Sequence, residues 1–206
     1  MKLFNSIFNK KKDIKFNNQT LRSAVKQWLN DASSAEATYG HISSWDTSKI
    51  TDMSELFLDA YTFNEPLNNW DVSNVSNMHA MFDNAYVFNQ PLDNWDVGSV
   101  TDMSEMFSSM EALVFNQQLN NWNVSNVTDM CGMFSGAEAF NQPIGNWDVS
   151  KVGSMGGMFS GATSFNQDLN GWNVSSLSWV EGMFYGATSF NSPVGKWKLK
   201  STTGQS

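Results

Sequence analysis

One pattern of apolar and polar positions repeats along this chain with a spacing of 25 residues. Taking a recurring tryptophan as position 1, position 6 is aliphatic, positions 9 and 12 are mostly methionine, and positions 13 and 19 are always phenylalanine once a longer third copy is allowed for. A fixed period of this length is typical of stacked-repeat proteins. Five of the six intervals are 25 residues and one is 27, between Trp45, Trp70, Trp95, Trp122, Trp147, Trp172 and Trp197.

Two shorter periods inside the repeat predict its local structure. Apolar residues at positions 6, 9, 12, 13 and 16 have the spacing of one helix face, so the stretch from Val75 to Ala85 is predicted to be a short helix. Position 23, the next tryptophan and the valine two beyond it give the pattern L-x-x-W-x-V, whose last three residues alternate as in a short strand. The predicted fold class is therefore α/β: a leucine-rich-repeat-like solenoid with one short strand and one short helix per 25-residue repeat and an N-terminal helical cap.

The pattern divides the chain into four segments. Residues 1–19 are basic and expected to be flexible, 20–44 form a helical cap and linker, 45–196 form the six-repeat solenoid, and 197–206 form a closing strand end and a flexible tail. Within the cap, the stretch 20–30 has the apolar spacing of a helix, whereas 32–40 is rich in small residues and is expected to be a linker.

The third repeat carries two extra residues in SSMEALVF, between Phe107 and Phe115. Such insertions map to loops and sometimes carry function. Because Met110, Leu113 and Val114 are apolar, the favoured interpretation is a longer helix end that repacks locally.

Charge and cysteine content narrow the classes of function. The net charge is −8, but residues 45–195 hold only Lys49 and Lys151 against 17 acidic residues, a net of −15. An acidic body argues against nucleic acid as a partner. Cys131 is the only cysteine, so a disulfide framework is excluded. We find no transmembrane segment and no readable signal peptide, so the chain is either unexported or exported by a route that the sequence does not reveal.

The chemistry-bearing residues favour a protein that is not an enzyme and needs no cofactor or metal. His41 and His79 are the only histidines, and the acidic residues have neither metal-ligand nor catalytic-triad spacing. The recurring methionines at positions 9 and 12 and the recurring tryptophans at position 1 are interpreted as core. An invariant asparagine at position 20 is interpreted as a ladder that bonds the backbone of the neighbouring repeat: Asn64, Asn89, Asn116, Asn141, Asn166 and Asn191.

A stripe of polar residues at position 2 is the candidate binding site. It lies between two inward-facing positions and is expected to form a row on the strand-lined face, which is the usual binding surface of repeat proteins. Such a row either simply faces water, or docks a basic partner, or weakly holds Ca²⁺. The stripe consists of Asp46, Asp71, Asp96, Asn123, Asp148 and Asn173.

The repeat resembles that of the BspA-like leucine-rich-repeat surface proteins and the related mycoplasma proteins of unknown function. The likeness rests on TDMSELF at residues 51–57, TDMSEMF at 101–107, FNQPL at 88–92 and the intervening WDVS. The resemblance implies a secreted or surface-attached protein that binds a protein or cell-surface ligand and has no catalytic activity. We expect the chain to be a monomer. The alternative is an intracellular scaffold that binds a basic protein through the acidic face.

Overall fold

The N-terminal part of the chain folds into helices. The computed structural model describes residues 14–195 and 197. Helix α1 spans Asn18–Asn30, helix α2 spans Ala32–Tyr39, and the short 3₁₀ helix η1 spans Ile42–Ser44. Asn17 caps α1, because its side chain accepts a hydrogen bond from the Thr20 N–H at 2.9 Å. The predicted helix over 20–30 thus lies within α1.

The predicted linker over 32–40 is wrong, because this stretch forms α2. Its alanines and serines contain no helix breaker, and the Asp31 side chain accepts the Ser34 N–H at 3.0 Å as an N-cap. The helix ends at Gly40, which has a φ of 79°. Small residues therefore form a second, short helix here instead of a flexible connection.

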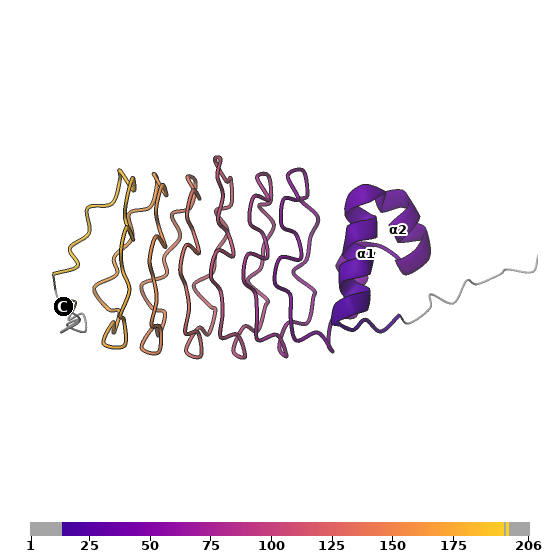
Figure 1. Cartoon of the computed structure of the whole chain (residues 1–206), viewed down its shortest axis with the longest axis horizontal. Coiled ribbons are helices and arrows are strands. Elements are labelled where there is room, and N and C mark those ends of the chain that lie inside the picture. The colour runs from indigo at the N-terminus through magenta and orange to yellow at the C-terminus, as the bar shows by residue number, and fades with distance from the viewer. Residues whose placement is uncertain (1–13, 196, 198–206) are drawn as a thin grey trace, which may run out of the picture.

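Each 25-residue repeat forms one coil of the chain, and the coils lie side by side in a row (Figure 1). Helix α1 lies along the first coil, and α2 lies on the side of α1 that faces away from the coils. We number the coils one to six from the tryptophan that begins each of them: Trp45, Trp70, Trp95, Trp122, Trp147 and Trp172.

The repeats contain no α-helix in the described chain, which corrects the predicted helix over residues 75–85. Position 11 of every coil has positive φ, as at Ala80 (49°) and Gly132 (61°), which interrupts a right-handed helix. The N–H groups at positions 9, 11, 13 and 15 donate to the next coil instead of to residues four earlier; Met78 donates to Asp102 and Phe82 to Met106, both at 2.9 Å. Overlapping β-turns, whose N–H groups donate to the carbonyl three residues earlier, therefore bury the stripe that a helix would bury.

The predicted strand in each repeat is also absent from the described residues. Bridges between neighbouring coils are isolated, parallel and at position 8, such as Asp52 with Asn77 and Asn77 with Asp102, and one further parallel bridge joins Lys15 to Asp46 of the first coil. Just after the W-x-V segment of coil two, the N–H of Val75 donates to the carbonyl of Val72 at 2.9 Å. This hydrogen bond closes a turn, so the segment does not continue as a strand. The prediction of an α/β, leucine-rich-repeat-like solenoid is therefore wrong. The fold is a stack of irregular, turn-rich coils behind two helices.

The proposed closing strand over 194–199 lies partly outside the described residues. The described positions 194, 195 and 197 are not in a strand. The segment 1–19 was expected to be flexible, but its described end is ordered, because Phe16 is buried and α1 begins at Asn18. Residues 1–13 and 198–206 fall outside the described chain.

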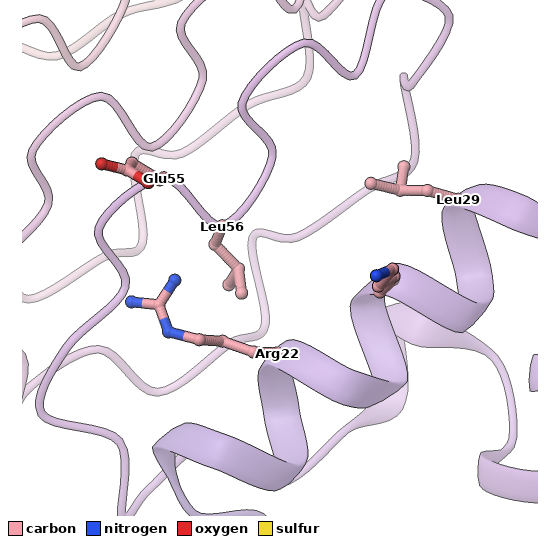
Figure 2. Close-up of a pocket in the computed structure, with 5 residues that line it drawn as sticks. Arg22, Leu29, Glu55 and Leu56 are labelled. Atoms are coloured by element: carbon pink, nitrogen blue, oxygen red, sulfur yellow. The ribbon is translucent and has the colours of Figure 1, made fainter.

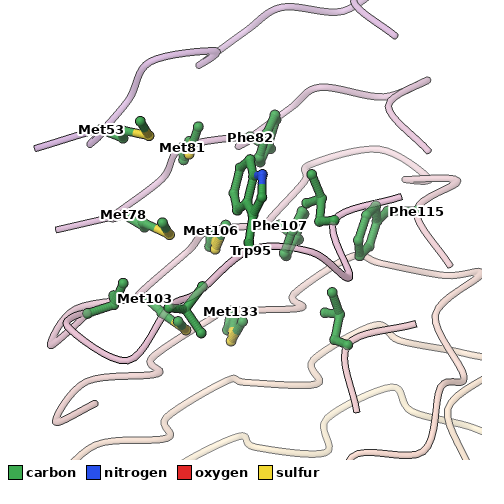
Figure 3. Packing of buried hydrophobic residues seen from close by; sticks show 14 of the residues in the cluster. Met53, Met78, Met81, Phe82, Trp95, Met103, Met106, Phe107, Phe115 and Met133 are labelled. Carbon is green, nitrogen blue, oxygen red and sulfur yellow. The ribbon is translucent and has the colours of Figure 1, made fainter. Parts of the chain in front are cut away.

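Stacked aromatic rings and methionines form the core. Phe82 lies over Phe107 of the next coil with ring centroids 5.5 Å apart and planes inclined by 3°, and it also stacks on Phe88 of its own coil at 4.1 Å. Figure 3 shows Met53, Met78 and Met103 following one another from coil to coil. These methionines are fully buried, and so the interpretation of the methionines as core is confirmed.

Two ladders of side chains satisfy the backbone between coils. From Trp95 onward, the indole N–H of each position-1 tryptophan donates to a carbonyl of an earlier coil; Trp147, for example, donates to Leu119 at 3.0 Å. Trp45 and Trp70 donate instead to Gly40 and Ile42, which precede the first coil. At position 20, the N–H of Asn141 donates to the side-chain oxygen of Asn116 at 3.0 Å, and Asn166 repeats this bond to Asn141 at 2.9 Å. The asparagine ladder expected from the sequence is confirmed.

Helix α1 completes the first coil, which has no coil before it. The Asn18 side chain accepts the Thr51 N–H at 3.0 Å, a group that bonds to the preceding coil in later repeats. The Arg22 guanidinium donates to the Ser54 carbonyl and to Asp52. The helix therefore provides the polar partners that a coil would provide. Among the described residues, no helix has both the length and the apolar character needed to cross a bilayer.

Candidate binding surfaces

The position-2 stripe is exposed, one residue per coil. Three pairs of neighbouring tryptophans at position 1 stack, with Trp95 and Trp122 6.3 Å apart, and the residues that follow each pair lie side by side. A Cβ atom built on Gly98 would lie 3.1 Å from the Asp96 carboxylate and 3.4 Å from the Asn123 amide, which places these two stripe residues around one point. The structure thus aligns the stripe, but on turns instead of strands.

Each stripe side chain caps its own turn. The Asp71 Oδ1 accepts both the backbone N–H (3.0 Å) and the hydroxyl (2.6 Å) of Ser73. The hydrogen bonds that Ser48 donates lower the pKa of Asp46, first through its hydroxyl and then through its backbone N–H. These bonds hold one carboxylate oxygen in place and keep the group ionised, so that the stripe is a fixed row of negative and amide groups.

A second polar row lies at positions 8 and 10. Ser104 Oγ donates to Asp102 at 2.6 Å, and His79 Nδ1 lies 2.8 Å from the same Oγ. This order differs from a catalytic triad, because the serine proton is directed to the carboxylate and the histidine has no acid behind it. The row orders the coil edge and does not activate a nucleophile.

Cys131 continues this row and is a poor nucleophile. Burial, followed by the negative charge of Asp129, raises the pKa of its thiol, which keeps it protonated at neutral pH. Within residues 14–195 and 197, no group of three or more histidine, cysteine or acidic side chains has metal-binding geometry.

A shallow pocket lies between α1 and the first coil. Arg22, Lys26 and Leu29 of the helix and Glu55 and Leu56 of the coil line it, and Figure 2 shows the Arg22 side chain extending from α1 toward the coil. Arg22 is already occupied by Ser54 and Asp52 in the contact that closes the stack. The pocket is the seam between cap and stack.

An exposed apolar strip crosses the edge of coils one to three, and sequence analysis did not detect it. The Tyr61 and Tyr86 rings stack with centroids 5.0 Å apart. Met110 is 91 % exposed, Val114 is 44 % exposed and Val87 is 42 % exposed. We call Tyr61, Tyr86, Val87, Met110 and Val114 the edge strip.

The insertion in coil three builds one end of the edge strip. The Val114 N–H donates to the Tyr86 carbonyl at 3.2 Å, and the Met110 N–H donates to the Asn84 side chain at 3.0 Å. Only Leu113 turns inward and is buried. The predicted longer helix end is therefore wrong: the insertion forms a loop, pinned to coil two, that displays two of its three apolar side chains.

A signal for the edge strip was present in the repeat comparison. Positions 17 and 18 are aromatic or aliphatic at Tyr61, Tyr86 and Val87, but the matching position 17 holds Glu138 in coil four and Thr163 in coil five. This difference escapes attention when only the residues shared by all copies are compared.

Asp59, Asp83 and Glu111 lie near the tyrosines of the edge strip, and Glu105 lies near Asp83; we call these four carboxylates the acidic rim. The negative charge of Asp59 is the largest of the effects that raise the pKa of Tyr61, and Glu111 contributes in the same direction. Burial raises the pKa of Asp83, and the charge of Glu105 raises it further. Among the described residues, ion pairs form only at Asp52 and Glu65, so none neutralises the rim.

Fold and surfaces together define a class of protein: a stack of coils of 25 or 27 residues, closed at its first coil by a helix, with exposed polar rows and, among the described residues, an apolar strip. The chain belongs to the family described as "Mycoplasma protein of unknown function, DUF285", whose model matches residues 23–125 and 109–206. No curated protein and no solved structure matches the chain.

Proposed function

We propose that this chain is a non-catalytic protein-binding module, displayed at the cell surface or secreted. The observation that carries the proposal is the regular, rigid surface, on which one exposed polar side chain per coil is held in place by its own turn, as in Asp71 with Ser73. Repeat proteins use extended surfaces of this kind to bind other proteins. The likeness of the repeat to BspA-like surface proteins supports the external location.

Protease treatment of intact source cells tests the location. Peptides from residues 45–195 released from living cells, identified by mass spectrometry, are the expected result. Release only after lysis would replace the surface assignment with the intracellular scaffold.

Capture of partners by the purified chain tests the binding role of the stripe. The double variant Asp71→Lys and Asp96→Lys is expected to weaken capture of a partner cross-linked on cells, because it reverses the charge of two adjacent stripe positions. Asp168→Lys, an exposed acidic residue outside the stripe, is the matched control. Equal capture by all three proteins would remove the stripe from the binding surface.

A further inference from the structure

We propose that the edge strip and its acidic rim form a docking site for a cationic amphipathic segment of another protein, one that interleaves Lys or Arg with apolar side chains. The inference rests on the proposed binding function and assigns it a particular surface and partner chemistry.

Three coils contribute side chains to the apolar half of the site. Tyr61 and Tyr86 present stacked rings, and the Val114 and Met110 backbone N–H groups tie the insertion loop to coil two. The side chain of Asn84, which holds Met110, itself donates to Asp59 of coil one at 2.9 Å. A chain of hydrogen bonds thus fixes all three coils beneath the strip, so a partner would lose little entropy in ordering it.

The composition of the strip matches that of binding hot spots. Tyrosine and methionine are enriched at the centres of protein interfaces. Tyr61 is 50 % exposed and Met110 is 91 % exposed, whereas Tyr86 is half-buried. The buried methionines show that the fold has room for methionine inside. The corresponding edge of coil five carries Thr163 and Ser164, so the stack does not require apolar residues at this edge.

The acidic rim selects the charge of the partner. Asp59, Asp83, Glu105 and Glu111 have no ion-pair partner among the described residues. A negative rim attracts Lys and Arg and repels nucleic acid and anionic membranes. Guanidinium and ammonium groups also stack on tyrosine faces, which brings the charged and apolar contacts together at Tyr61 and Tyr86.

A fluorescent amphipathic helical peptide of leucine and lysine tests the site by fluorescence anisotropy with the full chain. We expect saturable binding that weakens with salt. The double variant Tyr61→Ser and Tyr86→Ser should weaken it by about tenfold or more, since truncating a hot-spot aromatic costs more than ~1.4 kcal/mol. Tyr185→Ser, at a tyrosine that is 79 % exposed on coil six, is the matched control and should leave the affinity unchanged.

A second pair of variants tests the rim. Glu105→Gln with Glu111→Gln should weaken binding and flatten its salt dependence, whereas Glu181→Gln, an exposed acidic residue of coil six, should do neither. A peptide with glutamate in place of lysine should not bind. Urea unfolding of each variant checks that the coils remain stacked.

Three results would overturn the inference: no saturable binding of the leucine–lysine peptide, equal loss in the Tyr185→Ser control, or equal binding of the glutamate peptide. Tighter peptide binding after Lys10, Lys11 and Lys12 are changed to Gln would also overturn it. That result would show that the basic start of this chain, or of a second copy, is what binds the strip. The proposed function fails separately: it falls if the wild-type chain captures no partner from cells. A partner captured equally by the edge-strip variants leaves the function standing and removes this site.

Discussion

The indole Nε1 of Trp122 donates a hydrogen bond to the carbonyl oxygen of Leu92, thirty residues earlier, at 3.0 Å, in a buried position. The same side chain stacks on Trp95 with ring centroids 6.3 Å apart. One residue therefore provides apolar contact between coils and the polar partner of a backbone group that has no access to water. This double role explains why tryptophan, and not another aromatic residue, marks every repeat.

The two roles of Trp122 can be separated by substitution. Trp122→Phe retains most of the apolar contact but leaves the Leu92 carbonyl without its donor, so we expect a loss of about 1–3 kcal/mol in the free energy of unfolding. Trp122→Ala should cost roughly 3–5 kcal/mol, because it also leaves a cavity. Urea unfolding measures both. Trp179→Phe, at a tryptophan that is 54 % exposed, is the control and should change stability by less than about 0.5 kcal/mol. A near-neutral Trp122→Ala would contradict the assigned packing.

The asparagine ladder should stabilise the fold through the side-chain oxygen that accepts a backbone hydrogen bond from the next coil. In Asn116→Ala, the Asn141 N–H loses the side-chain oxygen to which it donates at 3.0 Å, and we expect a loss of about 1–2 kcal/mol by urea unfolding. Asn116→Asp keeps an acceptor of the same shape and should lose less. If alanine and aspartate are equally tolerated, the ladder does not stabilise the stack.

Left-handed backbone should make some glycines irreplaceable. Gly136 has a φ of 70°, and a Cβ on it would collide with the Ser109 carbonyl oxygen of the preceding coil. Gly136→Ala should therefore destabilise the protein by about 2 kcal/mol or more, read from its melting temperature and urea midpoint. Gly195→Ala is the control, because a Cβ there meets nothing within 4 Å. An unchanged midpoint for Gly136→Ala would show that coils three and four do not approach as described.

Asp83 should make stability depend on pH in the opposite direction from the capped aspartates. Burial, and then the charge of Glu105, raise its pKa, so the folded state binds the proton more tightly than the unfolded state. The resulting penalty is fully present above the folded pKa and disappears as the pH falls below the unfolded pKa. Asp83→Asn should therefore raise the urea midpoint at pH 7 and leave it nearly unchanged at acidic pH. The reverse pH order would contradict this sign.

Asp46 and Asp148 should stabilise the folded protein at neutral pH and lose this stabilisation at acidic pH, as carboxylates with lowered pKa values do. Serine hydroxyl and backbone hydrogen bonds lower the pKa of each, from Ser48 and Ser150 respectively. The stabilisation is present above the unfolded pKa and is lost as the pH falls through the folded pKa. Asp148→Ala should consequently lower the melting temperature at pH 7 more than at low pH. An effect independent of pH would assign its role to something other than the carboxylate charge.

Chelation should leave the melting temperature unchanged. The Asp71 Oδ1 already accepts two hydrogen bonds from Ser73, and the stripe alternates carboxylates with amides in its later coils. Differential scanning calorimetry with a chelator, and then with added Ca²⁺, measures this. A lower melting temperature after chelation would favour the ion-binding interpretation of the stripe.

The core could be predicted because burial leaves a direct trace in the sequence. The residues at positions 1, 3, 9, 12 and 13 of coil two, from Trp70 to Phe82, are all buried, as their apolar character indicated. The binding surfaces were harder to predict from the sequence. The stripe could be located by its alternation, but the edge strip depends on how Tyr61 and Tyr86 meet across coils and on where the insertion loop turns.

By itself, the sequence determined the repeat length, the residues of the core, the N-terminal helix and the asparagine ladder, because a 25-residue pattern of apolar side chains must be buried by neighbouring copies. The tertiary structure decided the backbone conformation. A stripe with helical spacing can also be buried by overlapping turns, provided that the N–H groups find acceptors in the next coil, as Phe82 does at Met106. Those acceptors exist only after stacking. Hydrogen bonding between coils, which no local pattern encodes, therefore replaced the expected strands and helices with turns.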